Sequence, residues 1–170
     1  LWETYALINE DVWYDLAVNE TVAFEAAVGA SWSGIRAAVA FKHLGMNLIL
    51  DALHAVMYSG VKGLVLIVGG DPDIISSTNA VDIRLFAFHA RIPILEPATV
   101  QECKDLVHTA FELSEKIELP VLIYSPTRLN HTTELVTCTS PAHSLIPQAN
   151  RHFQPNRDKY LNAIHWAKRN

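Results

Sequence analysis

Short apolar stretches alternate with longer helix-forming stretches along most of this chain, and that order limits the fold more than any other feature. Residues 63–69, GLVLIVG, are apolar without a break, as in a strand that is covered on both faces. Repeated strand-then-helix order indicates parallel strands joined by helical crossovers. The sequence therefore predicts an α/β fold with a doubly wound, mostly parallel sheet and helices on both faces. We expect strands at residues 36–41, 63–69, 92–97 and 119–125, and helices at residues 20–33, 48–59, 80–90 and 99–117.

Both ends of the chain are less regular. Residues 12–17, VWYDLA, are rich in strand-forming residues, and residues 127–139 are a candidate additional strand. We expect one domain over residues 1–138 and a linker or tail over the Pro- and Asn-rich residues 139–170. The chain begins at Leu1 rather than Met, inside a helix-like stretch, so we interpret it as a fragment or as a protein without its natural start. A missing first strand would leave an open sheet edge, which favours an oligomer.

Capping residues mark the starts of three of the expected helices. Asn19 is a good N-cap for the first of them. Thr99, with Glu102 three residues later, forms a capping box for the last. Either Asn79 or Thr78 can cap the helix expected at residues 80–90.

Composition excludes several classes of function. Of the 170 residues, half are hydrophobic and 18% are charged, with a net charge of −5, so no basic excess favours nucleic-acid binding. No apolar run reaches the roughly 18–20 residues of a membrane span. The two cysteines, Cys103 and Cys138, fit a reducing compartment such as the cytoplasm and have no metal-ligand spacing. They are too few for an iron–sulfur cluster, which usually takes about four thiolates.

Polar loops follow the predicted strands at one edge of the sheet. Ligands of doubly wound folds bind beyond the carboxyl ends of the strands. In the predicted order this edge carries residues 18–20, 42–47, 69–79 and 125–131, each with polar or charged side chains in an otherwise apolar chain. The sequence therefore predicts a pocket there without identifying its ligand, because it contains no dinucleotide fingerprint, phosphate loop or hydrolase nucleophile elbow.

Several motifs in a fixed order identify a related family. They are VNETVAFEAAVGASWSG at residues 18–34, KHLGMN at 42–47, GVKGLVLIVGGDP with SSTN at 60–79, the stretch at 92–123, and TRLNH at 127–131. In these motifs the chain resembles the pyrimidine-binding domain of thiamine-diphosphate-dependent 2-oxoacid:ferredoxin oxidoreductases. The likeness is strongest to the alpha subunits of the indolepyruvate type and covers nearly the whole chain. The family's usual first strand, with its GYPGTPSS-like turn, is missing.

The resemblance implies a catalytic role for Glu20. In thiamine enzymes a glutamate bonds the N1′ nitrogen of the aminopyrimidine ring and favours the 4′-imino tautomer, which takes the thiazolium proton. A carboxyl group buried beside apolar atoms favours its protonated form and can donate to N1′. The small residues Ala26, Ala27, Gly29 and Ala30 would let a flat ring or a partner domain come close. The alternative is a first-turn acid that interacts with the helix dipole.

The resemblance also implies roles for the next two loops. Lys42 could hold the carboxylate of a 2-oxoacid and His43 could move a proton, although both could instead lie in a solvated loop. We therefore predict Glu20 and His43 as catalytic residues. The loop GGDPDIISSTN departs from the family's usual DDPGMHSSQN, notably at Ile75, so an altered substrate or lost function stays open. The predicted cofactor-binding residues are Asn19, Glu20, Lys42, Gly45, Asn47, Asp71, Ser76, Ser77 and Asn79.

Other charged and imidazole side chains receive structural interpretations. We interpret Asp82 and Arg84 as a buried ion pair rather than as a site. Arg128 and His131 could equally face the pocket or lie on an ordinary surface. Three histidines within helices are expected to be partly buried packing residues, namely His54, His89 and His108.

The implied cofactor is thiamine diphosphate, with its diphosphate and Mg²⁺ held by a partner domain or subunit. In the full complex, electrons from the 2-oxoacid would pass through iron–sulfur clusters to ferredoxin, and coenzyme A would take the acyl group. The chain alone is not expected to turn over. Two alternatives stay open: a catalytically inactive binding or assembly module of the same fold, and a thiamine-dependent decarboxylase or transferase that is not coupled to ferredoxin.

Overall fold

A four-stranded parallel sheet forms the centre of the computed structural model, which describes residues 12–137. Its strands are β1 (Ala37–Lys42), β2 (Leu64–Gly70), β3 (Ile94–Leu95) and β4 (Val121–Pro126), in the order β1-β2-β4-β3. The predicted parallel sheet is therefore confirmed. The predictions for the first 11 residues, for Cys138 and for the tail at 139–170 lie outside the described residues.

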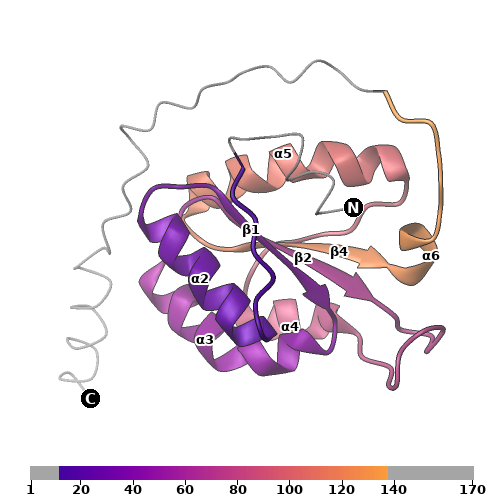
Figure 1. Ribbon diagram of the computed structural model, residues 1–170, viewed down its shortest axis with the longest axis horizontal. Coiled ribbons are helices and arrows are strands. Elements are labelled where there is room, and N and C mark those ends of the chain that lie inside the picture. The colour runs from indigo at the N-terminus through magenta and orange to yellow at the C-terminus, as the bar shows by residue number, and fades with distance from the viewer. Residues whose placement is uncertain (1–11, 138–170) are drawn as a thin grey trace.

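Helices cover both faces of the sheet, as predicted (Figure 1). Helices α2 (Glu20–Trp32), α3 (Gly45–Ser59) and α4 (Ile83–Ala90) pack on one face, and α5 (Val100–Ile117) packs on the other. A single helical turn, α6 (Thr127–Asn130), follows β4. The arrangement is the α/β architecture that the alternating sequence pattern predicts.

Strand position in the sheet explains strand composition. The central strands β2 and β4 are buried along almost their whole length, which agrees with the unbroken apolar sequence of β2 and the mostly apolar sequence of β4. Strand β1 lies at an edge, and α5 packs mainly on β2 and β4. As a result, β1 alternates, with Val39 buried and with Ala38 and Ala40 exposed.

The larger core lies between the sheet and the helices α2, α3 and α4. On α3 the buried side chains Met46, Ile49, Leu53 and Val56 recur at intervals of three and four residues, so one stripe of the helix faces the sheet. Phe24 of α2 is also fully buried in this core. Each such side chain contributes about 1.5–3 kcal/mol through its removal from water.

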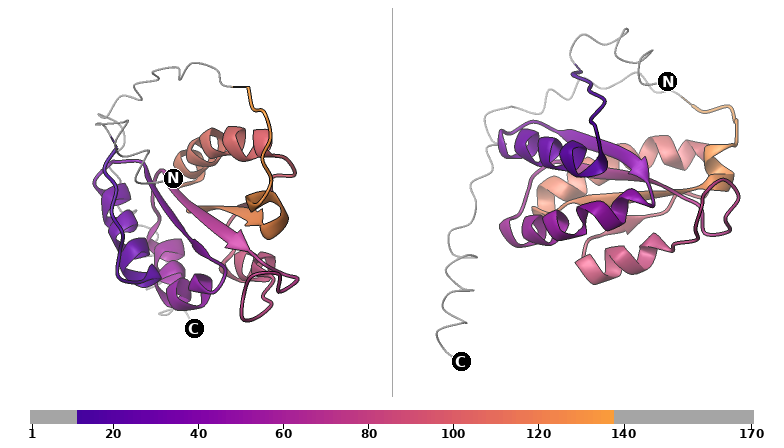
Figure 2. Two further views of the ribbon diagram at one scale, coloured as in Figure 1. Left: turned by 45° about the vertical axis from the view of Figure 1, so that its right-hand side comes forward. Right: turned by 60° about the horizontal axis from the view of Figure 1, so that its bottom comes forward.

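The strand register brings three loops to the same edge. Lys42 at the end of β1 pairs with Gly69 of β2, which in turn pairs with Ser125 of β4. The chain after each of these strands therefore begins at the same level. Figure 2 shows that the loop between β2 and α4 extends beyond this edge, on the same side as α6.

The predictions for three segments were wrong. Residues 12–17 form no strand, because β-forming residues need a neighbouring strand for their backbone hydrogen bonds, and Trp13 and Leu16 are exposed. Helix α4 begins after Asp82, whose side chain accepts from the Arg84 N–H, rather than after Asn79 or Thr78. The candidate strand after residue 127 begins instead with α6, and no strand follows up to residue 137.

The other two predicted caps are confirmed. Asn19 Oδ1 accepts from the Val22 N–H at 2.9 Å, and Thr99 Oγ1 accepts from the Glu102 N–H at 3.2 Å. Glu102 completes the capping by accepting from the N–H of Ala98, one residue before the cap. Among the described helices, none is both long enough and apolar enough to cross a membrane.

Candidate functional site

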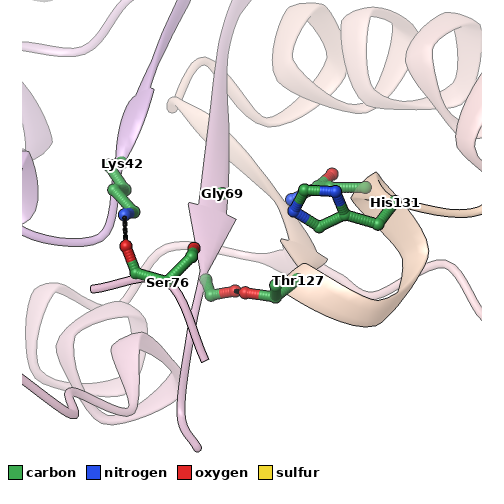
Figure 3. Close-up of a pocket in the computed structure, with 7 residues that line it drawn as sticks. Lys42, Gly69, Ser76, Thr127 and His131 are labelled. Atoms are coloured by element: carbon green, nitrogen blue, oxygen red, sulfur yellow. Dashed lines mark hydrogen bonds between the residues drawn. The ribbon is translucent and has the colours of Figure 1, made fainter. Parts of the chain in front are cut away.

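An open pocket of about 190 Å³ lies where β1, β2 and β4 end. Figure 3 shows Lys42 and Ser76 on one side of the end of β2, with Thr127 and His131 on the other. The predicted pocket at the carboxyl edge is therefore present, with contributions from three of the four predicted loops. The residues that line it are Lys42, Gly69, Gly70, Ser76, Thr127, Asn130 and His131.

Lys42 forms part of one side of the pocket. Its Nζ donates a hydrogen bond to the main-chain carbonyl of Ser76 at 2.9 Å (Figure 3). An ammonium group carries three N–H donors, and the Ser76 carbonyl uses one of them. Lys42 therefore ties the loop after β2 to β1 and still presents positive charge to the pocket.

The Asp71 carboxylate holds the loop that follows β2 through hydrogen bonds to its backbone. It is fully buried and accepts from the backbone N–H groups of Ile75 at 2.8 Å and Ser76 at 2.6 Å. Burial by itself would raise the pKa of Asp71, but the hydrogen bonds from the amides of Ser76 and Ile75 hold that pKa well below its usual range. The carboxylate is therefore ionised and used within its own loop.

A close contact between Gly70 and Tyr124 shapes the floor of the site. A Cβ on Gly70 would lie 1.8 Å from Cε2 and 2.5 Å from Oη of Tyr124, so no side chain fits there. Thr127 Oγ1 donates to the Gly70 carbonyl at 2.7 Å and holds the end of β2 against the end of β4. Burial raises the pKa of Tyr124, so its hydroxyl stays neutral.

Glu20 lies at the same edge but outside the pocket. It begins α2, is half-buried, and packs against Gly45, where a Cβ would lie 2.6 Å from Glu20 Cγ. Within residues 12–137 its carboxylate has no hydrogen-bond or ion-pair partner. The carboxylate of Glu20 thus has no polar partner among the described residues, and the small Gly45 leaves space for its side chain.

His43 is turned into the interior. It is fully buried, and its Nε2 lies 3.2 Å from the main-chain carbonyl of Asn79. It does not line the pocket. The predicted side chains Asn19 and Asn47 make local contacts: Asn19 caps α2, and Asn47 Nδ2 donates to the Leu44 carbonyl at 3.4 Å.

The ion pair of Asp82 and Arg84 is present but is not buried as predicted. Arg84 Nε lies 2.8 Å from Asp82 Oδ1, and the two side chains are 49% and 39% exposed. Asp82 is the N-cap that precedes α4 and accepts from the Arg84 N–H, a role that keeps its carboxylate at the surface. His131 lines the pocket, whereas Arg128 lines a second cavity of about 290 Å³ beside Glu96 on the other side of α6.

The helix histidines are more exposed than predicted. The side chains of His54, His89 and His108 all lie on the outer faces of their helices. The rings of His54 and His89 meet edge to face, with centroids 4.9 Å apart. His108 Nδ1 lies 3.6 Å from Glu112, one turn along α5.

Sequence reasoning missed four residues of the pocket wall. Their signals were present: two glycines directly after an apolar strand indicate close backbone approach, and a threonine directly after a strand can reach a neighbouring strand end. Within the described part of the chain, no three His, Cys, Asp or Glu side chains come together as a metal site. The missed residues are Gly69, Gly70, Thr127 and Asn130.

Comparison with known proteins identifies the family. A sequence model of the pyruvate flavodoxin/ferredoxin oxidoreductase family, thiamine diphosphate-binding, matches residues 4–169. Indolepyruvate oxidoreductase subunit IorA of Pyrococcus horikoshii is 41% identical over 166 residues, which cover 94% of this chain and 25% of that protein. IorA of Pyrococcus abyssi is 48% identical over 121 residues, covering 71% of this chain and 19% of that protein.

A solved structure supports the fold. The 2-oxoglutarate:ferredoxin oxidoreductase from Magnetococcus marinus, solved with 2-oxoglutarate, coenzyme A and succinyl-CoA bound, superposes with a TM-score of 0.66 at 17% identity. The match covers 82% of this chain and 28% of that one. The chain thus spans 25% or less of the length of the two IorA relatives above. It belongs to the thiamine-diphosphate-binding family of pyruvate flavodoxin/ferredoxin oxidoreductases.

Proposed function

We propose that this chain forms the pyrimidine-side wall of a thiamine diphosphate site in a 2-oxoacid:ferredoxin oxidoreductase of the indolepyruvate type. The observation that carries the proposal is the state of Glu20: an acid at the carboxyl edge, set against Gly45, without a polar partner in residues 12–137. Family membership and the identity to IorA sequences favour the same reading.

The residues at this edge fit one wall of a cofactor site rather than a closed site. Gly45 leaves the space that Glu20 fills, and Lys42 and Ser76 line an open pocket nearby. When bound, thiamine diphosphate supplies an electron sink for breaking the bond between a keto carbon and a carboxylate. Glu20 would hold a ring nitrogen of the cofactor, and Lys42 would hold the substrate carboxylate.

A partner must complete this arrangement. Glu20 is only half-buried, and a surface that covered it would exclude water and strengthen a hydrogen bond from the carboxyl group. We propose that a partner domain or subunit covers this edge and carries the diphosphate and Mg²⁺. Iron–sulfur clusters and ferredoxin would act elsewhere in the oligomeric enzyme, and coenzyme A would enter the completed site to take the acyl group, so the isolated chain would not turn over.

The direct test is the effect of Glu20→Gln and Glu20→Ala in the assembled enzyme. The measurement is the rate at which bound thiamine diphosphate exchanges its thiazolium proton with D₂O. Loss of a positioned acid–base group slows proton transfer by about 10²–10⁴-fold. Glu25→Gln, an exposed acid on the same helix, is the matched control and should leave the rate unchanged.

Equal exchange rates in the wild type and both Glu20 variants would refute the assigned role. A non-catalytic assembly module is the second candidate, because Glu20 does not line the pocket of this chain. That candidate requires normal assembly in the Glu20 variants together with no thiamine diphosphate binding by the wild type. The same experiment therefore separates the two functions.

A further inference from the structure

His43 is a buried titratable residue that the proposed mechanism does not use. It directly follows β1, and its backbone is fixed on both sides. Its N–H donates to the Gly69 carbonyl at 2.8 Å, and its carbonyl accepts from the Met46 N–H at 3.2 Å. The side chain therefore leaves the backbone at a point with little freedom and enters the interior.

Among the described residues the imidazole makes one polar contact, and this contact shows which nitrogen donates. Nε2 lies 3.2 Å from the Asn79 carbonyl, and since a carbonyl oxygen only accepts, Nε2 carries the hydrogen. Nδ1 is buried and has no partner among the described residues. The geometry therefore makes Nε2 the donor of this hydrogen bond.

Asn79 lies at the far end of the loop that forms one side of the pocket. The loop is held at its start, where Asp71 accepts from the Ile75 and Ser76 amides. Lys42 holds its middle through the Ser76 carbonyl, and His43 holds its end through Asn79. Two consecutive residues at the end of β1 therefore anchor a loop that follows β2.

We propose that His43 is a positioning residue that fastens residues 71–79 to the end of β1, so that Ser76 stands in the pocket wall before any ligand binds. A wall formed in advance spares the ligand the entropy cost of ordering it. Only this last consequence rests on the proposed function. The anchoring itself is a property of the chain without ligand.

The test compares His43→Leu and His43→Gln in the purified full chain without cofactor. Leucine keeps an apolar side chain and removes the donor, whereas glutamine places an amide donor near the position of Nε2. Backbone hydrogen exchange of residues 72–79 is measured by mass spectrometry. We expect His43→Leu to speed exchange of the Ile75 and Ser76 amides about fivefold, the factor that one lost hydrogen bond produces. His43→Gln should restore protection.

Two outcomes would overturn the anchoring role. The first is unchanged exchange in His43→Leu, and the second is an increase in α5 and β4 as large as that in the loop, since that result means general destabilisation. If His43→Leu does not fold, the wild type still provides a test through ¹⁵N spectroscopy of its imidazole at neutral pH. A hydrogen on Nε2 supports the proposal, and a ring with its hydrogen on Nδ1 and a bare Nε2 refutes it.

Cofactor affinity separates this proposal from the proposed function. In the assembled enzyme, His43→Leu should weaken thiamine diphosphate binding severalfold, with recovery in His43→Gln. If the wild type binds no thiamine diphosphate while the loop still loosens in His43→Leu, the anchoring stands and the proposed function fails. If thiamine diphosphate binding and proton exchange depend on Glu20 while hydrogen exchange in the loop is unchanged in His43→Leu, the proposed function stands and the anchoring role fails.

Discussion

Gly45 and Glu20 are in mutual contact at the carboxyl edge of the sheet: a Cβ on Gly45 would lie 2.6 Å from Glu20 Cγ and 2.9 Å from Cδ2 of Phe41. Both distances are too short for real atoms, so the Glu20 side chain and the Phe41 ring would both have to move. The glycine at the start of α3 therefore decides where the acid of α2 sits. This relationship links a packing requirement to the proposed site.

We expect Gly45→Ala to displace Glu20 and to weaken thiamine diphosphate binding by the assembled enzyme at least tenfold. Overpacking costs about 1–3 kcal/mol, and the better helix propensity of alanine offsets up to about 1 kcal/mol of it. Urea unfolding gives the stability change, and calorimetric titration gives the affinity. Gly29→Ala is the control, because a Cβ there meets nothing within 4 Å, and it should be neutral or stabilising.

Gly70→Ala should destabilise the fold by about 3 kcal/mol or more, because the added Cβ would lie 1.8 Å from a ring atom of the buried Tyr124. Thermal unfolding is the measurement. The cost should shrink in the background Tyr124→Leu, which removes the clashing ring. A full cost in that background would show that the backbone of Gly70, not the aromatic contact, is responsible.

Tyr124→Phe should leave stability unchanged or slightly increase it. The hydroxyl is buried and has no hydrogen-bond partner among the described residues, so its removal breaks no hydrogen bond. The aromatic ring and its contact with Gly70 are retained in phenylalanine. A loss above about 1 kcal/mol in urea unfolding would indicate a partner for the hydroxyl.

Acid should destabilise the chain partly through Asp71. Its pKa in the folded protein lies below the value near 4 expected of an unfolded chain, so the folded state favours the ionised form. The stabilisation is therefore complete above about pH 4 and declines as the pH falls toward the lower, folded value. Asp71→Asn should lower stability at neutral pH and flatten the acid side of the stability curve.

The control for this curve is Asp73→Asn, an exposed acid in the same loop. It removes the same charge without removing the two amide contacts of Asp71. The measurement is urea unfolding between about pH 2 and pH 7, the window in which carboxylates titrate. An acid limb that is equally steep in wild type and Asp71→Asn would contradict the assignment.

The ion pair of Arg36 and Glu115 should contribute measurably to stability. Arg36 Nε and Nη2 donate to the two carboxylate oxygens at 2.7 and 3.0 Å, and both side chains are less than a quarter exposed. Such bidentate, partly buried pairs stabilise a fold more than ordinary surface pairs do. We expect Arg36→Lys to cost about 1 kcal/mol in thermal unfolding, because lysine lacks the planar pair of donors.

The matched control for Arg36 is Lys104, which pairs with Asp105 at 2.6 Å on the exposed side of α5. Its substitution Lys104→Met should change stability by less than about 0.5 kcal/mol, as is usual for surface pairs. If Arg36→Lys and Lys104→Met lower the free energy of unfolding equally, the bidentate geometry of the Arg36 pair adds no stability.

The overall architecture was accessible from local sequence patterns. The apolar run at 63–69 predicted a strand that is covered on both faces, and the structure has it as β2 at the centre of the sheet, next to the predicted strand that forms β4. The caps Asn19 and Thr99 were also correct, because a cap is a contact over three residues. The strand predicted at 12–17 failed because a strand requires a neighbour that local sequence does not specify.

The sequence by itself determined the order of strands and helices, the edge where their polar loops gather, and the family. Only the tertiary structure decided what each polar side chain of those loops contacts. His43 and Asn79 are 36 residues apart, and Thr127 and Gly70 are 57 residues apart, yet each pair is hydrogen-bonded. Such partners depend on strand register and on how closely the backbones approach, so Lys42 reaches the pocket while the adjacent His43 is buried.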